Sequence, residues 1–122
     1  MTARVRAIRG ATTVDADTPD AIRKSTQELV STLLERNGLE PDDLVSIIFT
    51  TTPDITAAFP ATSARDLGLD DVPLLGCQEI DVPGAVALCL RVLVTCYTER
   101  SQREVVHVYL QGARSLRADL VD

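Results

Sequence analysis

Four polar side chains lie inside segments that resemble buried strands, where they could bind a small anion. Glu79 and Arg91 interrupt the mostly apolar stretch from Val72 to Tyr97, and Arg9 and Tyr109 occupy similar positions near the two ends of the chain. Removing a charge from water costs several kcal/mol unless a partner compensates for it. We therefore expect these four residues to meet and to line one site for an anionic ligand.

The strands that would carry these residues are predicted from alternating and short apolar runs. The alternation places Arg9 on the same face as Val5, and Arg91 on the same face as Cys89 and Leu93. Residues 85–98 also show helical spacing, but their β-branched content favours a strand. The expected strands are residues 3–12, 44–51, 72–79, 85–98 and 105–110.

One long amphipathic helix is predicted from about residue 18 to 37. Asp17 or Thr18 would cap it, Pro19 would occupy its first turn, and Gly38 would end it. Residues 61–67 can form at most a second, short helix. These elements predict a single α+β domain over residues 1–122, a mixed five-stranded sheet with the long helix on one face. The uncovered apolar face predicts a homo-oligomer.

Composition argues against several classes of function. The 122 residues carry a formal charge of -6, which argues against binding to nucleic acid or to an acidic membrane surface. The three cysteines, Cys77, Cys89 and Cys96, lack metal-ligand spacing, so we expect reduced thiols and no metal site. The opening residues lack the apolar core of a signal peptide, and no run is long enough to span a membrane. A cytoplasmic protein is expected.

Seven short motifs are spread over nearly the whole chain: IRGATTV at 8–14, TPD at 52–54, FPA at 59–61, QEIDVPG at 78–84, LRV at 90–92, HVYL at 107–110 and LR at 116–117. In this order they resemble the AroH class of chorismate mutase. The resemblance implies a homotrimer in which three sheets form a pseudo-β/α barrel, with active sites at the subunit interfaces. It also implies conversion of chorismate to prephenate, for aromatic amino-acid biosynthesis, without metal or cofactor.

The chemistry of this Claisen rearrangement fits the residue types. Chorismate is a dianion that must fold its enolpyruvyl arm over the ring, and the breaking C–O bond gathers negative charge on the ether oxygen. No acid, base or nucleophile is needed. A preorganised cation beside that oxygen, with groups that hold the folded conformer, would accelerate the reaction.

The resemblance gives each of the four residues a role. Arg91 is expected to be the cation at the ether oxygen, while Arg9 and Tyr109 are expected to hold the carboxylate of the enolpyruvyl arm. Glu79 corresponds to the acceptor for the ring hydroxyl. Glu79 could equally pair with one of the arginines, and we expect both interactions.

Further residues are assigned to substrate binding by the same resemblance. From the neighbouring subunit, Phe59 and Ala61 are expected against the ring, with Arg65 near the mouth of the site. A Lys of the family near the entrance is replaced by Thr62, which reduces the local positive charge.

The remaining assignments concern the wall and the entrance of the site. Leu74 corresponds to an apolar wall, and Leu116 and Arg117 correspond to the start of a tail over the entrance. Gly76 stands where the best-known members have a Cys that can contact the ring hydroxyl, so that side-chain contact is absent in this chain.

A second hypothesis belongs to a different class of protein. A non-catalytic trimer of related fold could bind small carboxylates in the same clefts, because architecture alone does not decide activity. The simultaneous presence of Arg9, Glu79, Arg91 and Tyr109 favours the mutase.

Overall fold

A mixed sheet forms the centre of the chain in the computed structural model, which describes residues 2–120, with the backbone alone for 118–120. Five strands appear over these residues, in the order β3-β2-β4-β1-β5. Strand β4 is antiparallel to β1 and β2, whereas β3 runs parallel to β2 and β5 runs parallel to β1. The predicted mixed sheet is confirmed. The strands are β1 (Arg4–Thr13), β2 (Leu44–Thr51), β3 (Leu74–Gln78), β4 (Cys89–Thr98) and β5 (Val108–Tyr109).

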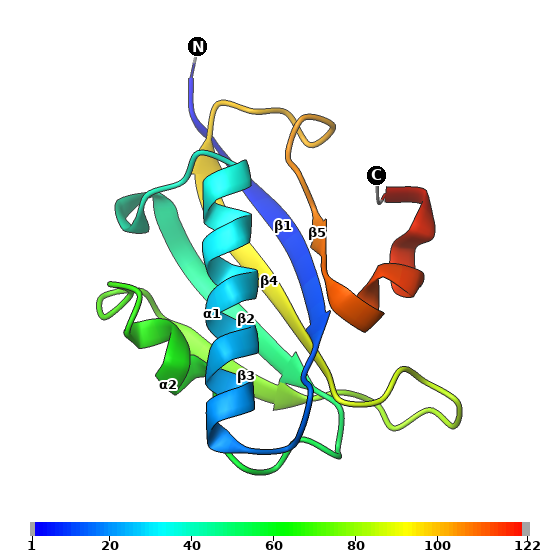
Figure 1. Cartoon of the computed structure of the whole chain (residues 1–122). Coiled ribbons are helices and arrows are strands. Elements are labelled where there is room, and N and C mark those ends of the chain that lie inside the picture. Colours follow the sequence, from blue (N-terminus) through cyan, green and yellow to red (C-terminus); the bar gives the residue numbers. More distant parts are fainter. Residues whose placement is uncertain (1, 121–122) are drawn as a thin grey trace.

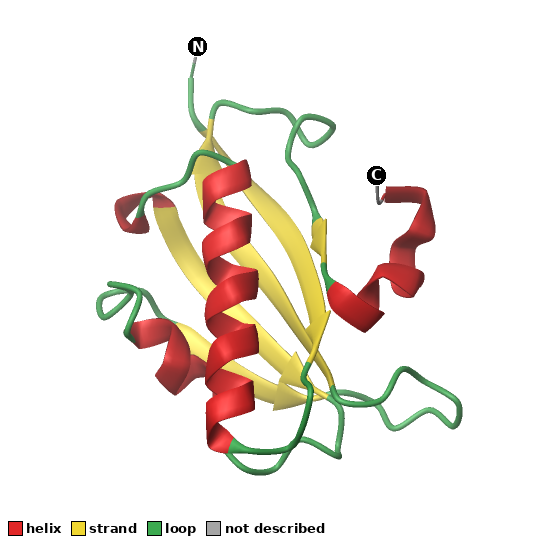
Figure 2. Ribbon diagram, in the orientation of Figure 1, coloured by secondary structure: helices red, strands yellow, loops and turns green. Residues whose placement is uncertain are grey.

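Helix α1 (Pro19–Arg36) lies across one face of this sheet, as Figures 1 and 2 show. Thr18 is the N-cap, and its hydroxyl oxygen accepts a hydrogen bond from the Ala21 N–H at 3.2 Å. The chain leaves the helix through Gly38, whose φ of +63° suits a residue without a β-carbon. The short helix α2 (Pro60–Arg65) packs beside α1 and β3. The expected long and short helices are both found.

The core lies between α1 and the sheet. Phe49, Ile8, Leu29 and Leu90 are among its fully buried side chains, and burial of each contributes about 1.5 to 3 kcal/mol. Gly10 of β1 lets the strand approach the helix closely. A β-carbon there would lie 3.0 to 3.2 Å from side-chain carbons of β4 and α1.

The opposite face of the sheet is largely open. Val5, Leu75, Leu93 and Tyr97 point to this side and are 39 to 60% exposed. One corner is covered, because the 3-10 turns of η2 (Gln111–Leu120) fold back beside β1 and β5. There Ala113 and Leu116 pack in a small cluster of their own with Ala11, Cys89, Val86 and Tyr109.

Several predicted boundaries were wrong. Strand β4 begins at Cys89 instead of 85, because Leu88 adopts a left-handed φ of +48° that breaks the extended backbone. Strand β5 has only two residues instead of the six predicted at 105–110. Strand β3 is shorter than the predicted strand 72–79 at both ends. The residues after Gly112 form 3-10 turns, with a break at Arg117. Within residues 2–120, no helix is long and apolar enough to cross a membrane.

Candidate active site

The register of the strands aligns five residues in one row across the open face. Thr50 of β2 pairs with Cys77 of β3 and with Arg91 of β4, and Ala11 of β1 pairs with Arg91 and with Tyr109 of β5. Strands in a sheet lie about 4.8 Å apart, so roughly 10 Å separates the backbones at Arg91 and Tyr109. The sheet itself therefore spaces two of the predicted site residues.

Arg91, the central residue of this row, forms an ion pair with Glu79, which lies just beyond the end of β3. The Nε of Arg91 lies 3.2 Å from Oε2 of Glu79, and the same oxygen accepts a hydrogen bond from the Thr50 hydroxyl at 3.0 Å. The Glu79 N–H donates to the Thr51 carbonyl at 2.8 Å, which fixes the carboxylate just beyond β3. The side chains remain 49% and 29% exposed, so a ligand in solvent can reach the pair.

The pair lines a cleft of about 400 Å3 with a mostly apolar wall. This volume is in the range of small-molecule sites. Burial raises the pKa of the Cys89 thiol, and a hydrogen bond from Arg91 opposes that shift only in part. Cys89 is therefore a neutral thiol beside the guanidinium. Other lining residues are Thr52, Ile80, Val82, Val86, Ser115 and Leu116.

Arg9 and Tyr109 lie on the same open face. Arg9 is exposed and precedes Ala11 by two residues, whereas Tyr109 is only 8% exposed and packs against Ala11 and Cys89. The Arg9 N–H donates to Nδ1 of His107 at 3.0 Å. Burial, and secondarily the charges of Arg9 and Arg117, lower the pKa of His107. The imidazole is thus held neutral as an acceptor.

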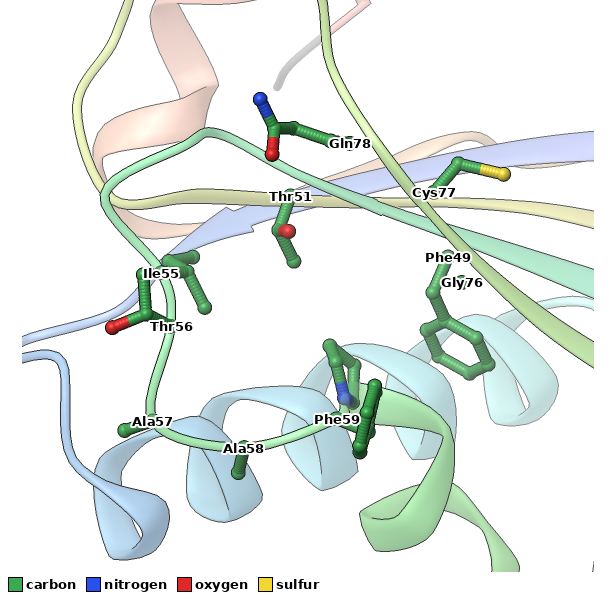
Figure 3. Close-up of a pocket in the computed structure, with 11 residues that line it drawn as sticks. Phe49, Thr51, Ile55, Thr56, Ala57, Ala58, Phe59, Gly76, Cys77 and Gln78 are labelled. Atoms are coloured by element: carbon green, nitrogen blue, oxygen red, sulfur yellow. The ribbon is translucent and has the colours of Figure 1, made fainter.

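One of the two predicted ring-contacting residues borders a different hollow. Phe59 is 79% exposed and lines a space of about 460 Å3 beside β2, β3 and α2, shown in Figure 3. The Phe49 ring points toward this space, whereas the Cys77 sulfur points away from the space. Asp17 fixes the loop before Phe59 by accepting from the Thr56 hydroxyl and the N–H groups of Thr56 and Ala57, at 2.7 to 2.9 Å.

The remaining predicted residues lie on α2, β3 and η2. Ala61 and the exposed Arg65 lie on α2, and Leu74 begins β3 and packs against the core. Leu116, by contrast, lines the Arg91 cleft of its own chain, and Arg117 follows at the break in η2. Within one chain, Phe59, Ala61, Arg65 and Leu74 are not brought together with Arg91.

Cys89 lines the cleft and Thr50 hydrogen-bonds Glu79, and we had given neither residue a role in the site from the sequence. Alternation in LVSIIFTT places Thr50 on the same face as Ile48, but only the pairing of β2 with β4 shows that this face carries Arg91. Cys89 is two residues from Arg91 in a strand, so it shares its face and could have been included. Over residues 2–120, no three His, Cys, Asp or Glu side chains are grouped so that they could hold a metal ion.

The geometry first defines a class of protein. A small α+β chain displays a guanidinium, a carboxylate and a tyrosine on one sheet face, and such a face suits recognition of a small polar anion by fixed charges. Comparison with known proteins then identifies the family, because residues 5–120 match the family "Chorismate mutase type I".

Named relatives and a solved structure agree with this match. The chain is 49% identical over 117 residues to chorismate mutase AroH of Thermus thermophilus, covering 95% of this chain and 96% of that one. It is 42% identical to chorismate mutase AroH of Bacillus subtilis, covering 95% and 92%. A chorismate mutase from Clostridium thermocellum superposes with a TM-score of 0.89 at 48% identity, over 90% of this chain and 98% of that one. The chain belongs to the AroH-class chorismate mutase family.

Proposed function

We propose that this protein is a chorismate mutase that converts chorismate to prephenate in the cleft beside Arg91. The observation that carries the proposal is the Arg91–Glu79 pair, at 3.2 Å in an accessible cleft, in a chain 49% identical to a named chorismate mutase. The reaction moves electrons around six atoms of one molecule: one C–O bond breaks and one C–C bond forms. No proton is transferred, and the residues serve only to bind, bend and stabilise.

Arg91 stabilises the negative charge that develops on the ether oxygen as the C–O bond breaks. Its Nε is engaged by Glu79, and in this proposal N–H groups of the terminal nitrogens donate to the ether oxygen. Thr50 holds Glu79 in place, and Glu79 in turn orients Arg91 before substrate arrives. Such preorganisation is effective because the charge needs no rearrangement during the reaction.

Arg9 and Tyr109 bind the carboxylate of the enolpyruvyl arm. Two strand spacings, about 10 Å, separate Tyr109 from Arg91, which is comparable to the width of a small ring with a folded side arm. Groups held at both ends of the substrate favour its bent conformer over the extended one.

A second copy of the chain completes the site in this proposal. Phe59 lines the other hollow, Ala61 and Arg65 lie on α2, and Leu74 begins β3. In a homotrimer these four residues would face the Arg91 cleft of the neighbouring chain, with Leu116 and Arg117 at the entrance. The exposed apolar side chains of the open sheet face support such packing, since patches of this kind are commonly buried by association. The expected assembly is a pseudo-β/α barrel of three sheets.

Loss of chorismate absorbance, with prephenate identified as the product, tests the function. The native chain should turn over chorismate, and Arg91→Ala should lower kcat/KM by about 10²- to 10³-fold, as removal of a preorganised charge does in other sites. Arg23→Ala is the matched control, because it removes an exposed arginine of α1 whose guanidinium pairs with Asp20 at 3.0 Å. Equal inactivity of native and Arg91→Ala chains that still bind a dicarboxylate would instead support the non-catalytic binding module.

A further inference from the structure

The TPD motif at 52–54 meets the first residues of β4 in a compact hydrogen-bonded node. Leu88 N–H donates to Oδ2 of Asp54 at 2.8 Å, and the Thr52 hydroxyl donates to Oδ1 of the same carboxylate. Cys89 N–H donates to the Thr52 hydroxyl oxygen at 2.9 Å, and Thr52 N–H donates to the Cys89 carbonyl at 3.0 Å. The motif therefore fixes Leu88, the residue before the strand that carries Arg91, and Cys89, the first residue of that strand.

Leu88 is strained at this point. Its φ of +48° lies in the left-handed region, which a residue with a β-carbon seldom occupies unless its surroundings hold it there. The side chain packs against the core, and the Leu88 carbonyl accepts from the Val14 N–H at 2.8 Å. Both backbone polar groups of the strained residue thus have partners, and Asp54 supplies one of them.

The strain lies at the end of the loop that forms one wall of the cleft. Residues 80–87 project beyond the end of the sheet, as the yellow-green segment of Figure 1 shows. Val82 N–H donates to Ile80 and Ala85 N–H donates to Val82, so these bonds stay inside the loop. The loop is tied at one end to the sheet, by Glu79 N–H to the Thr51 carbonyl of β2, and at the other end to the TPD motif, by Leu88 N–H to Asp54. Its wall residues are Ile80, Val82, Gly84, Ala85 and Val86.

We propose that Asp54 is a positioning residue of the Arg91 cleft, whose carboxylate holds Leu88 in its left-handed conformation and thereby sets the direction of the 80–87 wall. Asp54 does not contact the reacting atoms. It acts through the backbone of Leu88, and the inference about catalysis rests on the proposed function. The hydrogen bond from Thr52, and then that from Leu88, lowers the pKa of Asp54 below its ordinary 3.8, so the carboxylate is charged at neutral pH.

Amide exchange of the native chain and of Asp54→Ala measures the contact without any substrate. The Leu88 amide should exchange on the order of tenfold faster in Asp54→Ala, because its acceptor is gone. Asp54→Asn keeps a carbonyl oxygen and should restore most of the protection. Asp20→Ala, which removes an exposed carboxylate at the start of α1, should leave this amide unchanged. Unchanged exchange at Leu88 in Asp54→Ala would overturn the proposal.

A double-mutant cycle with Leu88→Gly tests whether strain is what Asp54 opposes. Glycine adopts the left-handed region without a steric penalty, so Asp54→Ala should destabilise the Leu88→Gly background less than the native background. Loss of the leucine side chain cancels in the cycle. Strictly additive effects on the urea midpoint would show that Asp54 does not act through this backbone conformation.

Kinetics separates positioning from a purely structural role. In Asp54→Ala, kcat/KM should fall about ten- to a hundredfold, chiefly because KM rises. The wall confines the substrate but does not contact the breaking bond. A purely structural role would lower the melting temperature and leave the KM of the folded protein unchanged. The two inferences can fail separately. If the native chain and all variants fail to turn over chorismate, but the amide-exchange and double-mutant results are as expected, then Asp54 still positions the wall and only the proposed function is wrong.

Discussion

The Nε of Arg91 lies 3.2 Å from Oε2 of Glu79, and this contact joins the residue that follows β3 to the first residues of β4 across the intervening strand β2. The substitution Glu79→Gln tests the function of this ion pair. An amide oxygen can still accept from Arg91, but the charge that orients the guanidinium is lost. We expect kcat/KM to fall about tenfold, with a stability change within about 1 kcal/mol because the pair is partly exposed. Steady-state kinetics and urea unfolding of the same preparation measure both quantities.

Glu79→Ala provides the comparison for this prediction. It removes the acceptor altogether, leaves the Thr50 hydroxyl without its carboxylate, and should cost about 10²-fold in kcat/KM. Equal activity of the native chain and both variants would contradict the role given to Glu79.

Tyr109→Phe should separate the hydroxyl from the ring. The ring packs against Ala11 and Cys89 and is almost fully buried, and phenylalanine preserves that packing. We expect a stability change below about 1 kcal/mol, but about a tenfold fall in kcat/KM from loss of one hydrogen bond to substrate. Unaltered kinetics would remove Tyr109 from substrate binding.

His107 gives the protein a defined dependence of stability on pH. Burial first, and then Arg9 and Arg117, lower its pKa in the folded chain below the ordinary 6.5. As pH falls below 6.5, the unfolded chain takes up this proton before the folded chain does. Folding stability should therefore decline, by no more than about 1.4 kcal/mol per pH unit, until the lower folded pKa is reached.

Urea unfolding between about pH 7.5 and 5.5 measures this decline, before most carboxylates begin to titrate. His107→Asn is the matched variant, because its amide oxygen can accept from Arg9 N–H but does not titrate. It should remove the decline. The hydrogen-bonded carboxylates Asp17, Asp54 and Glu104 have lowered pKa values, so their stabilisation is lost only in more acidic solution. The same pH dependence in native and variant chains would show that His107 is not its source.

Leu75→Glu should disrupt the proposed trimer while preserving the chain's own fold. Leu75 is 60% exposed on the open sheet face, so a charge costs little in one chain but must be desolvated if this face packs against another copy. Sedimentation should give a three-chain mass for the native protein and a smaller mass for the variant. Ser31→Glu, on the exposed side of α1, adds the same charge as a control. A native monomer would contradict the trimer.

The regular elements were predictable from the sequence because each has a strong local signal. Alternation placed Arg9 and Arg91 on the correct faces of their strands, and capping residues located α1 to within one residue at each end. The predicted length of β5 was too great because the residues before Val108 make hydrogen bonds with side chains in place of strand pairing. The side chain of Asn37 bonds both backbone groups of Val106, and the His107 ring accepts from Arg9 N–H. Such side-chain bonds have no periodicity to detect.

The site was only partly predictable for a related reason. The ion pair of Glu79 with an arginine was expected because two charges in apolar surroundings need partners. The part played by Thr50 depends on which strands are neighbours, and the sheet order β3-β2-β4-β1-β5 does not follow chain order. The early start predicted for β4 failed at Leu88, where a contact with Asp54 supports a backbone conformation that leucine rarely adopts.

The row of residues across the open face also determines where the chain can tolerate insertions. Side chains alternate along a strand, so one extra residue between Cys89 and Arg91 would turn the guanidinium inward beneath α1 and direct an apolar neighbour outward. Added residues in the turn at 99–104 would leave that alternation intact. Length variation compatible with activity should therefore be confined to such turns, and a strand of fixed length becomes as much a requirement for turnover as the arginine it carries.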